Sequence, residues 1–241
     1  MQQLNVEVEL VKAAPDGHQR TPACGGNGLG ALQCGQGRAL HHRTARPPGA
    51  TTAFDKAGDI GMQGAAGHVQ ALLGAAHDSE VVFTSCGTES DNWAIQAALW
   101  QNRHRGRHII TTAVEHSAVL EPCKLLQQQG YEVTYLAPDK TGHVTAEQVA
   151  QALREDTVLV SMMLVNNENG CRLPVENVFR MVKRNDPEII THCDAVQGFL
   201  KIPFKPRTLC ADLVSVSGHK VHALKGVGAL YIRHGVRVKP I

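Results

Sequence analysis

The stretch Asp212-Leu-Val-Ser-Val-Ser-Gly-His-Lys220 determines the fold prediction, because an apolar run ends there in a small-residue turn that carries a lysine. The run from Asp212 to Val216 is typical of a buried strand. A lysine behind a Ser-Gly turn, where backbone approaches a ligand closely, is well placed to act as a nucleophile toward an aldehyde. A solvated loop lysine is the alternative interpretation of Lys220, and the lysine alone favours it.

Composition places the chain among ordinary globular proteins, with 43% hydrophobic and 19% charged residues in 241. A net charge of +2 is too small to indicate a nucleic-acid partner. Apolar runs are all shorter than the roughly 20 residues that span a bilayer, and the N-terminus carries acids where a signal peptide carries basic residues. We therefore expect a cytoplasmic protein that binds neither nucleic acid nor a membrane.

The seven cysteines are odd in number and contain no Cys-x-x-Cys pair, which indicates reduced thiols and not a disulfide framework. The thirteen histidines show no spacing typical of zinc ligands. We therefore expect no metal site.

Residues 1–72 hold twelve of the 23 glycines and lack a regular apolar period, apart from a strand-like alternation from Leu4 to Leu10. The run Gly25-Gly-Asn-Gly-Leu-Gly30 does not have the Gly-x-Gly-x-x-Gly spacing of a dinucleotide site. We therefore divide the chain into a poorly patterned segment, residues 1–72, which we expect to be poorly ordered, and a regular domain, residues 73–241.

Strand and helix patterns alternate from residue 73 onward. Strands are predicted at 80–85, 108–112, 131–136, 157–165, 189–193, 212–217 and 227–232. Helices are predicted at 93–100, from near Pro122, at 145–153 and from Pro174. This alternation predicts an α/β fold, with a mostly parallel sheet covered by helices.

Polar residues gather just past the ends of these strands, where ligands bind in such sheets. Thr88 and Asp91 resemble a capping pair, so a helix is predicted to begin beside Gly87 and Thr88 and to offer a phosphate seat. An ordinary strand-to-helix connection is the alternative there. The other residues past strand ends are His116, Asn167, Asp194, Gln197, Ser217, His219 and Lys220.

The chemistry of these residues matches one cofactor. A histidine can stack on a flat ring, an asparagine can donate to a phenolate oxygen, and an aspartate can hold a proton on a pyridine nitrogen. Lys220 would form a Schiff base with the aldehyde. Together they predict a site for pyridoxal 5'-phosphate (PLP).

Five motifs in this order resemble the cysteine desulfurase family of class V, fold-type I PLP enzymes, and the resemblance covers residues 73–241. The motifs are Phe83-Thr-Ser-Cys-Gly-Thr-Glu-Ser-Asp-Asn92, Val114-Glu-His116, Val165-Asn-Asn-Glu-Asn-Gly170, His192-Cys-Asp-Ala-Val-Gln197 and Ser215-Val-Ser-Gly-His-Lys220.

The resemblance implies a role for each matching residue. Lys220 carries the cofactor, Asp194 pairs with the pyridine nitrogen, and His116 stacks on the ring and assists proton transfer. Asn167 and Gln197 contact the ring oxygen. The residues implied for the phosphate are Gly87, Thr88, Ser217 and His219.

The implied reaction removes sulfur from L-cysteine and gives alanine and an enzyme persulfide, as part of sulfur metabolism and iron–sulfur cluster assembly. The resemblance also implies a homodimer and a sulfur-acceptor protein. Two alternatives remain: another class V PLP enzyme, such as a selenocysteine lyase or an aminotransferase, and a noncatalytic fragment that keeps only the fold. The Asn-Asn-Glu run and Glu115-His116 favour the desulfurase.

The sequence departs from the family pattern at both ends. The family's N-terminal motifs do not occur in residues 1–72. Its persulfide-forming cysteine and substrate-binding arginine lie beyond the position that matches Ile241, and none of the seven cysteines matches that nucleophile. We therefore expect an incomplete PLP-binding large domain, without the C-terminal small domain and with low turnover of L-cysteine.

Overall fold

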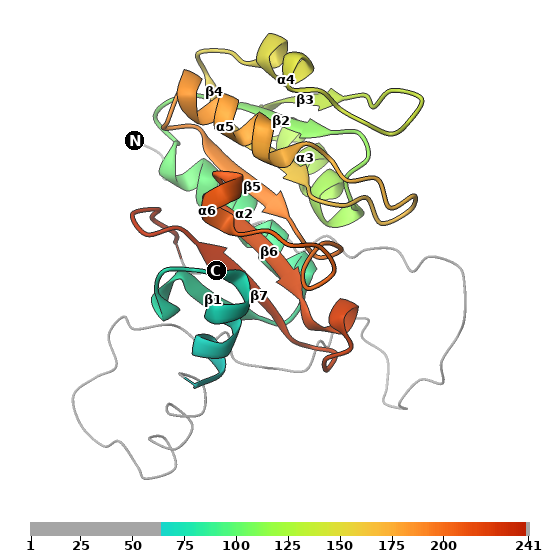
Figure 1. The fold of residues 1–241 in the computed structure, drawn as a ribbon. Helices are drawn as coiled ribbons and strands as arrows, with labels where there is room; N and C mark the ends of the chain where they lie inside the picture. The colour runs from blue at the N-terminus through green and yellow to red at the C-terminus, as the bar shows by residue number, and fades with distance from the viewer. Residues whose placement is uncertain (1–63, 240–241) are drawn as a thin grey trace, which may run out of the picture.

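The computed structural model describes residues 64–239, which form one sheet covered by helices on both faces (Figure 1). Its strands are β1 (Val81–Thr84), β2 (His108–Thr112), β3 (Glu132–Leu136), β4 (Thr157–Met163), β5 (Ile190–Asp194), β6 (Leu213–Ser217) and β7 (Gly228–Ile232). Their order across the sheet is β1-β7-β6-β5-β4-β2-β3.

The sheet is mostly parallel, as the sequence predicts. Strand β7 runs antiparallel to both of its neighbours, β1 and β6, while the other pairs are parallel. All seven residues of β4 are buried, which is typical of a central strand covered on both faces. The carboxyl ends of β1 to β6 therefore lie together along one side of the sheet, with the start of β7. We call this side, where the strands end, the carboxyl edge.

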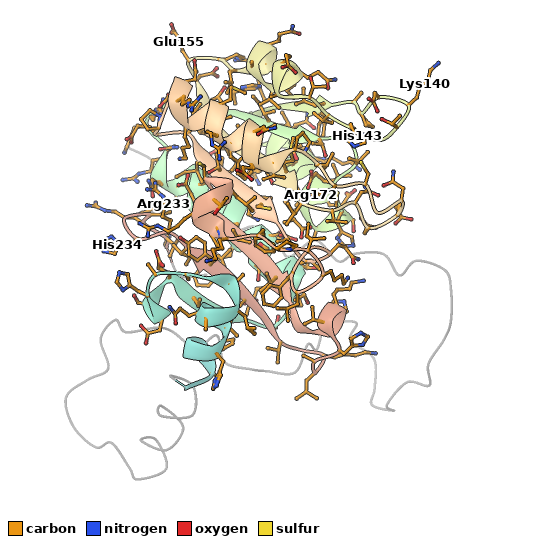
Figure 2. All side chains as sticks on the ribbon, viewed as in Figure 1. Lys140, His143, Glu155, Arg172, Arg233 and His234 are labelled. Carbon is orange, nitrogen blue, oxygen red and sulfur yellow. The ribbon has the colours of Figure 1, made fainter. Side chains whose placement is uncertain are left out.

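The two edges carry different loops, as Figure 2 shows. The carboxyl edge holds the loops that follow β3 and β4, with the labelled residues Lys140, His143 and Arg172. The opposite edge holds the residues before β4 and after β7, labelled Glu155, Arg233 and His234.

Two groups of helices enclose separate parts of the core. Helices α2 (Gly87–Gln101) and α3 (Ser117–Gln128) cover one face, where α2 lies behind the sheet in Figure 1. Helices α4 (Ala146–Ala152), α5 (Val175–Asn185) and α6 (Pro206–Leu209) cover the other. Short 3₁₀ turns, η1 (Asp78–Glu80) and η2 (Gly218–Val221), precede β1 and follow β6.

Helix α5 shows how the pattern of side chains produces this packing. Val175, Val178, Phe179 and Val182 are buried and recur at the spacing of one helix face. Pro174 is the residue just before the helix, as predicted from sequence.

The predicted start of α4 at Thr145 is also confirmed. The Thr145 hydroxyl accepts a hydrogen bond from the backbone N–H of Gln148, whose side chain accepts from the N–H of Thr145, so the two form a capping box.

The structure confirms the predicted start of α2 and corrects that of α3. Helix α2 begins at Gly87, where the helix N-terminus was predicted, but the predicted helical span 93–100 is too short and the N-cap is Cys86 and not Thr88. Helix α3 begins at Ser117 and contains Pro122, which we predicted as its start. The proline lacks one backbone donor, but the rest of the helix forms around it.

Upstream of β1, residues 64–73 are helical, with Ala66 and Leu73 buried. The glycines at 64 and 67 obscure this helix in the sequence. The remainder of the predicted N-terminal segment, including the Leu4–Leu10 strand and the Gly25–Gly30 run, lies outside the described residues. Among residues 64–239, we find no helix that is both long and apolar enough to cross a bilayer.

Candidate active site

The carboxyl edge of the sheet collects all nine residues predicted for the site, because each follows or ends a strand that terminates there. The residues are Gly87 and Thr88 after β1, His116 after β2, Asn167 after β4, Asp194 and Gln197 at and after β5, Ser217 at the end of β6, and His219 and Lys220 in η2.

The start of α2 lies against the ends of β5 and β6. A Cβ atom added to Gly87 would lie 2.8 Å from Val196 Cγ2 and 3.3 Å from Ser217 Cβ, so a glycine is needed for this close approach. The first-turn N–H groups of a helix have no intrahelical partner and carry the positive end of its dipole. Three predicted motifs therefore meet at one corner, where the start of a helix lies against the ends of two strands.

Ser217, the last residue of β6, links this corner to the lysine. Its side chain is 1% exposed, and its Oγ lies 2.9 Å from His219 Nδ1. Burial and the nearby charges of Lys220 and Lys225 lower the pKa of His219. Lys220 follows directly and is exposed. The structure thus places a hydroxyl, an imidazole and a primary amine in succession beyond the strand.

His116 is the N-cap of α3 and is half-buried. Its Nδ1 accepts a hydrogen bond from the backbone N–H of Ala118 at 3.1 Å. Because that nitrogen acts as an acceptor, a neutral His116 carries its proton on Nε2. Helix α3 therefore fixes the tautomer of this imidazole.

Asp194 ends β5 and is 5% exposed. Its Oδ1 accepts a hydrogen bond from the backbone N–H of Val196 at 2.9 Å. Burial raises the pKa of Asp194 to about 7, and the charge of Asp91 adds to that rise. A carboxyl of this kind binds a proton-bearing partner strongly.

The two predicted amides lie at this edge but bind their own neighbours. Asn167 Nδ2 donates to Glu168 Oε1 at 2.5 Å, and Gln197 Oε1 accepts from Lys201 Nζ at 2.8 Å. The adjacent Asn166 is buried instead, and its Oδ1 accepts from two backbone N–H groups of the following turn. Asn166 therefore braces the loop, a role that the sequence reasoning missed.

A second group of buried polar residues beneath the site was also missed. His192, Asp91 and Glu115 are each at most 5% exposed and lie on β5, on α2 and before α3. The alternation of side chains along β5 could have placed His192 on the same face as Asp194.

The five cysteines that the structure describes are all free thiols, as predicted. Burial raises the pKa of Cys123 to about 12 and that of Cys193 well above its usual value. Neither thiol is therefore activated as a nucleophile.

The residues present fit PLP on three observations. The corner around Gly87 is narrow enough to exclude a Cβ and offers free helix N–H groups to a phosphate. Asp194 is a buried carboxyl with a raised pKa, suited to a protonated ring nitrogen. Lys220 supplies an exposed amine beside the same corner.

Comparison with known proteins points the same way. The aminotransferase class-V family model matches residues 39–240, which begin upstream of the first motif quoted above. Cysteine desulfurase 2 of Trichormus variabilis is 49% identical over 186 residues, which are 76% of this chain and 46% of that protein. The chain spans about half the length of the curated relatives that it matches.

Two solved structures share the fold. A NifS-like protein has a TM-score of 0.76 at 43% sequence identity, covering 80% of this chain and 52% of that one. SspA in complex with cysteine has a TM-score of 0.74 at 36% identity, covering 86% of this chain and 58% of that one.

Proposed function

Since this chain belongs to the aminotransferase class-V family, whose members generally depend on PLP, we propose that it provides the cofactor site of a cysteine desulfurase. The reaction removes sulfur from L-cysteine and gives alanine and an enzyme persulfide. The contact of Gly87 with Val196 and Ser217 carries the proposal, because it joins the phosphate corner to the strands that deliver Asp194 and Lys220.

The phosphate would be held at the start of α2, by the N–H groups at Gly87 and Thr88. Ser217 and His219 would complete this seat from the end of β6, where their side chains already lie 2.9 Å apart. Lys220 Nζ would bind the cofactor covalently. Asn167 and Gln197 would contact the ring oxygen after their side chains leave Glu168 and Lys201.

PLP, when bound, supplies an electron sink for negative charge at the α-carbon of the amino acid. Asp194 would hold a proton at the ring nitrogen, because its buried carboxylate lacks solvation and is stabilised by a cationic partner. His116 would stack on the ring and could donate or receive a proton at Nε2, because Ala118 N–H occupies its Nδ1.

The proposal extends to the surroundings of the enzyme. The substrate is L-cysteine or a related amino acid, and the solved structure of SspA holds cysteine. The persulfide would pass to a sulfur-acceptor protein, and the complete enzyme would be a homodimer. A cytoplasmic location agrees with the five free thiols.

Cofactor attachment tests the proposal directly. The intact protein with PLP should show a visible absorption band, and borohydride reduction followed by peptide mapping should place the pyridoxyl group on Lys220. Lys220→Ala should abolish the band, whereas Lys225→Ala, a matched change five residues away, should keep it. Label on Lys225, or an unchanged spectrum of the Lys220 variant, would refute the assignment.

Turnover tests the substrate. A longer PLP-loaded form that also carries the persulfide-forming cysteine should form alanine from L-cysteine, measured beside selenocysteine and beside a 2-oxo acid acceptor, whereas the 241-residue chain alone should form little. Preference for selenocysteine, or amino-group transfer without alanine formation, would replace the desulfurase by another class V activity.

A further inference from the structure

A short segment between β2 and α3 carries His116, and the residue just before His116 is a buried acid. Glu115 is 5% exposed, although it lies in a connection at the carboxyl edge of the sheet. Its Oε1 accepts a hydrogen bond from the Thr112 hydroxyl at 2.6 Å and another from the backbone N–H of Met163 at 2.9 Å. Thr112 and Met163 are the last residues of β2 and β4. One carboxyl oxygen therefore ties the segment to the ends of two strands that are neighbours in the sheet.

The carboxyl of Glu115 takes the place of a strand neighbour. The pairing between β2 and β4 ends at Ile110 and Val160, before β4 reaches Met163. The backbone N–H that follows that of Met163 donates to the carbonyl of Asp194 on β5 at 2.8 Å. Because N–H groups alternate in direction along a strand, the N–H of Met163 faces the side of β2, where Glu115 supplies the acceptor. Removal of Glu115 would deprive a buried backbone donor of this partner.

A second buried side chain ties the same segment to the loop after β4. Asn166 is 6% exposed, and its Nδ2 donates to the backbone carbonyl of Val114 at 3.0 Å. On the other side of Glu115, the Nδ1 atom of His116 accepts from the N–H of Ala118. The two residues before His116 are thus fixed to β4 and its loop, while the imidazole is fixed to the start of α3.

Glu115 acts through its hydrogen bonds and not through a charge. Burial raises the pKa of Glu115 to about 8 against the lowering effect of the hydrogen bonds from Thr112 and Met163, and the charges of Asp194 and Asp91 add to the rise. At neutral pH the carboxyl therefore keeps its proton. Since Oε1 accepts both hydrogen bonds, the proton lies on Oε2, which is buried and has no partner among residues 64–239. An amide of the same shape would offer the same acceptor oxygen.

We propose that Glu115 is a positioning residue for His116: its Oε1 ties the segment before the imidazole to the ends of β2 and β4, and so fixes where the imidazole lies over the carboxyl edge. In the proposed PLP enzyme, on which the role of His116 rests, this tie would hold the imidazole against the cofactor ring. Glu115 acts only through His116 and does not itself exchange a proton in the reaction.

NMR of the intact, cofactor-free protein tests the proposal without PLP. The ¹⁵N signals of the His116 ring are identified by their loss in His116→Ala. Glu115→Ala should shift these signals and should make the Met163 amide exchange about tenfold faster, which corresponds to the loss of one hydrogen bond. Glu115→Gln keeps an acceptor oxygen in the same place, so it should retain both the wild-type ring signals and the slow exchange.

Two neighbouring threonines provide a second route if Glu115→Ala does not fold. Both are buried on β2, but the hydroxyl of Thr112 donates to Glu115, whereas within residues 64–239 that of Thr111 has no partner. Thr112→Val should shift the His116 signals in the same direction as Glu115→Ala and by a smaller amount, because Glu115 loses only one of its two donors. Thr111→Val, the matched control, should leave the His116 signals unchanged.

A comparison of PLP affinities in two backgrounds separates positioning from a simple loss of stability. Glu115→Ala should weaken PLP binding about fivefold in the wild-type background, the size of one stacking contact, and hardly at all in His116→Ala, where there is no ring to position. Asn102 is the control for stability, because its buried amide donates to the backbone carbonyls of Val158 and Glu188 at the opposite edge. Asn102→Ala should destabilise the protein, yet its effect on PLP affinity should be equally small in both backgrounds.

The outcomes separate this proposal from the proposed function. His116 signals that keep their wild-type positions in both Glu115→Ala and Thr112→Val would overturn the positioning role, as would equal losses of PLP affinity with and without the His116 ring. Failure of the wild type to bind PLP would instead refute the proposed function, and the NMR comparison of cofactor-free protein would still decide the role of Glu115.

Discussion

Gly87→Ala should weaken cofactor binding by distorting the corner between α2 and the ends of β5 and β6. The new methyl group would lie 2.8 Å from Val196 Cγ2 and 3.3 Å from Ser217 Cβ. Valine has a stiff χ1 angle, and Ser217 is buried on a strand, so neither can move aside freely. The start of α2 must shift instead.

The magnitude follows from two opposing effects. Overpacking of a filled site costs about 1–3 kcal/mol. Alanine is a better helix former than glycine by about 1 kcal/mol, although this gain is smaller in the first turn. We expect a net loss of about 1 kcal/mol in the free energy of unfolding. Cofactor affinity should fall about tenfold or more, because the displaced N–H groups are those proposed to hold the phosphate.

The assay is a pair of titrations: urea unfolding for stability, and PLP binding followed by visible absorption. Gly67→Ala is the matched control, since among residues 64–239 no atom outside its own stretch of helix lies within 4 Å of the new Cβ, and it should leave PLP affinity unchanged while slightly stabilising the protein. Val196→Ala combined with Gly87→Ala should recover affinity by making room for the methyl group. Unchanged affinity in Gly87→Ala, or no recovery in the double variant, would refute this packing argument.

Two further predictions concern stability. Asp212 is fully buried and pairs with Lys183 and with Arg233 Nε at 2.6 Å, at the edge opposite the site (Figure 2). Asp212→Asn should lower the free energy of unfolding by about 3 kcal/mol, because the largely buried amine of Lys183 loses its carboxylate; a loss below about 1 kcal/mol in urea unfolding would contradict this. For His192, the pKa is about 4 when folded and 6.5 when unfolded, so only the unfolded chain gains a proton between these values. The protonation of His192 therefore does not affect the free energy of unfolding above pH 6.5. As the pH falls from 6.5 to 4, it lowers the free energy of unfolding by up to about 3 kcal/mol. The buried carboxyls Asp91 and Asp194 act in the opposite direction in both proteins, so the comparison with His192→Gln should isolate the effect of His192. If the free energies of unfolding of the wild type and of His192→Gln changed in parallel with pH, this prediction would be wrong.

The strands could be predicted from the sequence because burial on both faces produces continuous apolar runs. Every residue from Thr157 to Met163 is buried, and the run is visible without knowledge of its neighbours. The rule that ligands bind at the carboxyl ends of parallel strands then placed the nine site residues at one edge. The fold and the location of the candidate site therefore follow from local pattern and topology.

The direction of each side chain could not be predicted in this way. Asn167 and Gln197 lie at the expected edge, yet their amides bind Glu168 and Lys201, which are close neighbours in the chain. These contacts depend on rotamers that sequence spacing does not specify. His192 also lies within hydrogen-bond distance of Ser161 Oγ and Ser215 Oγ, and these contacts depend on the pairing of β4, β5 and β6. No single sequence motif contains all three strands, so the contacts could not be predicted.

The first turns of α2 were left out of the predicted helical span 93–100 because buried polar residues there interrupt the usual periodicity of a buried helix. Ser90, Asp91 and Asn92 are at most 2% exposed, where apolar residues would ordinarily stabilise the helix. Two of these three residues keep a buried oxygen without a partner among the described residues, Asp91 Oδ1 and Asn92 Oδ1. Local rules of this kind are expected to fail where polar groups serve a ligand and not the core. Buried polar residues in the first turns of α2 therefore explain why the predicted helical span was too short.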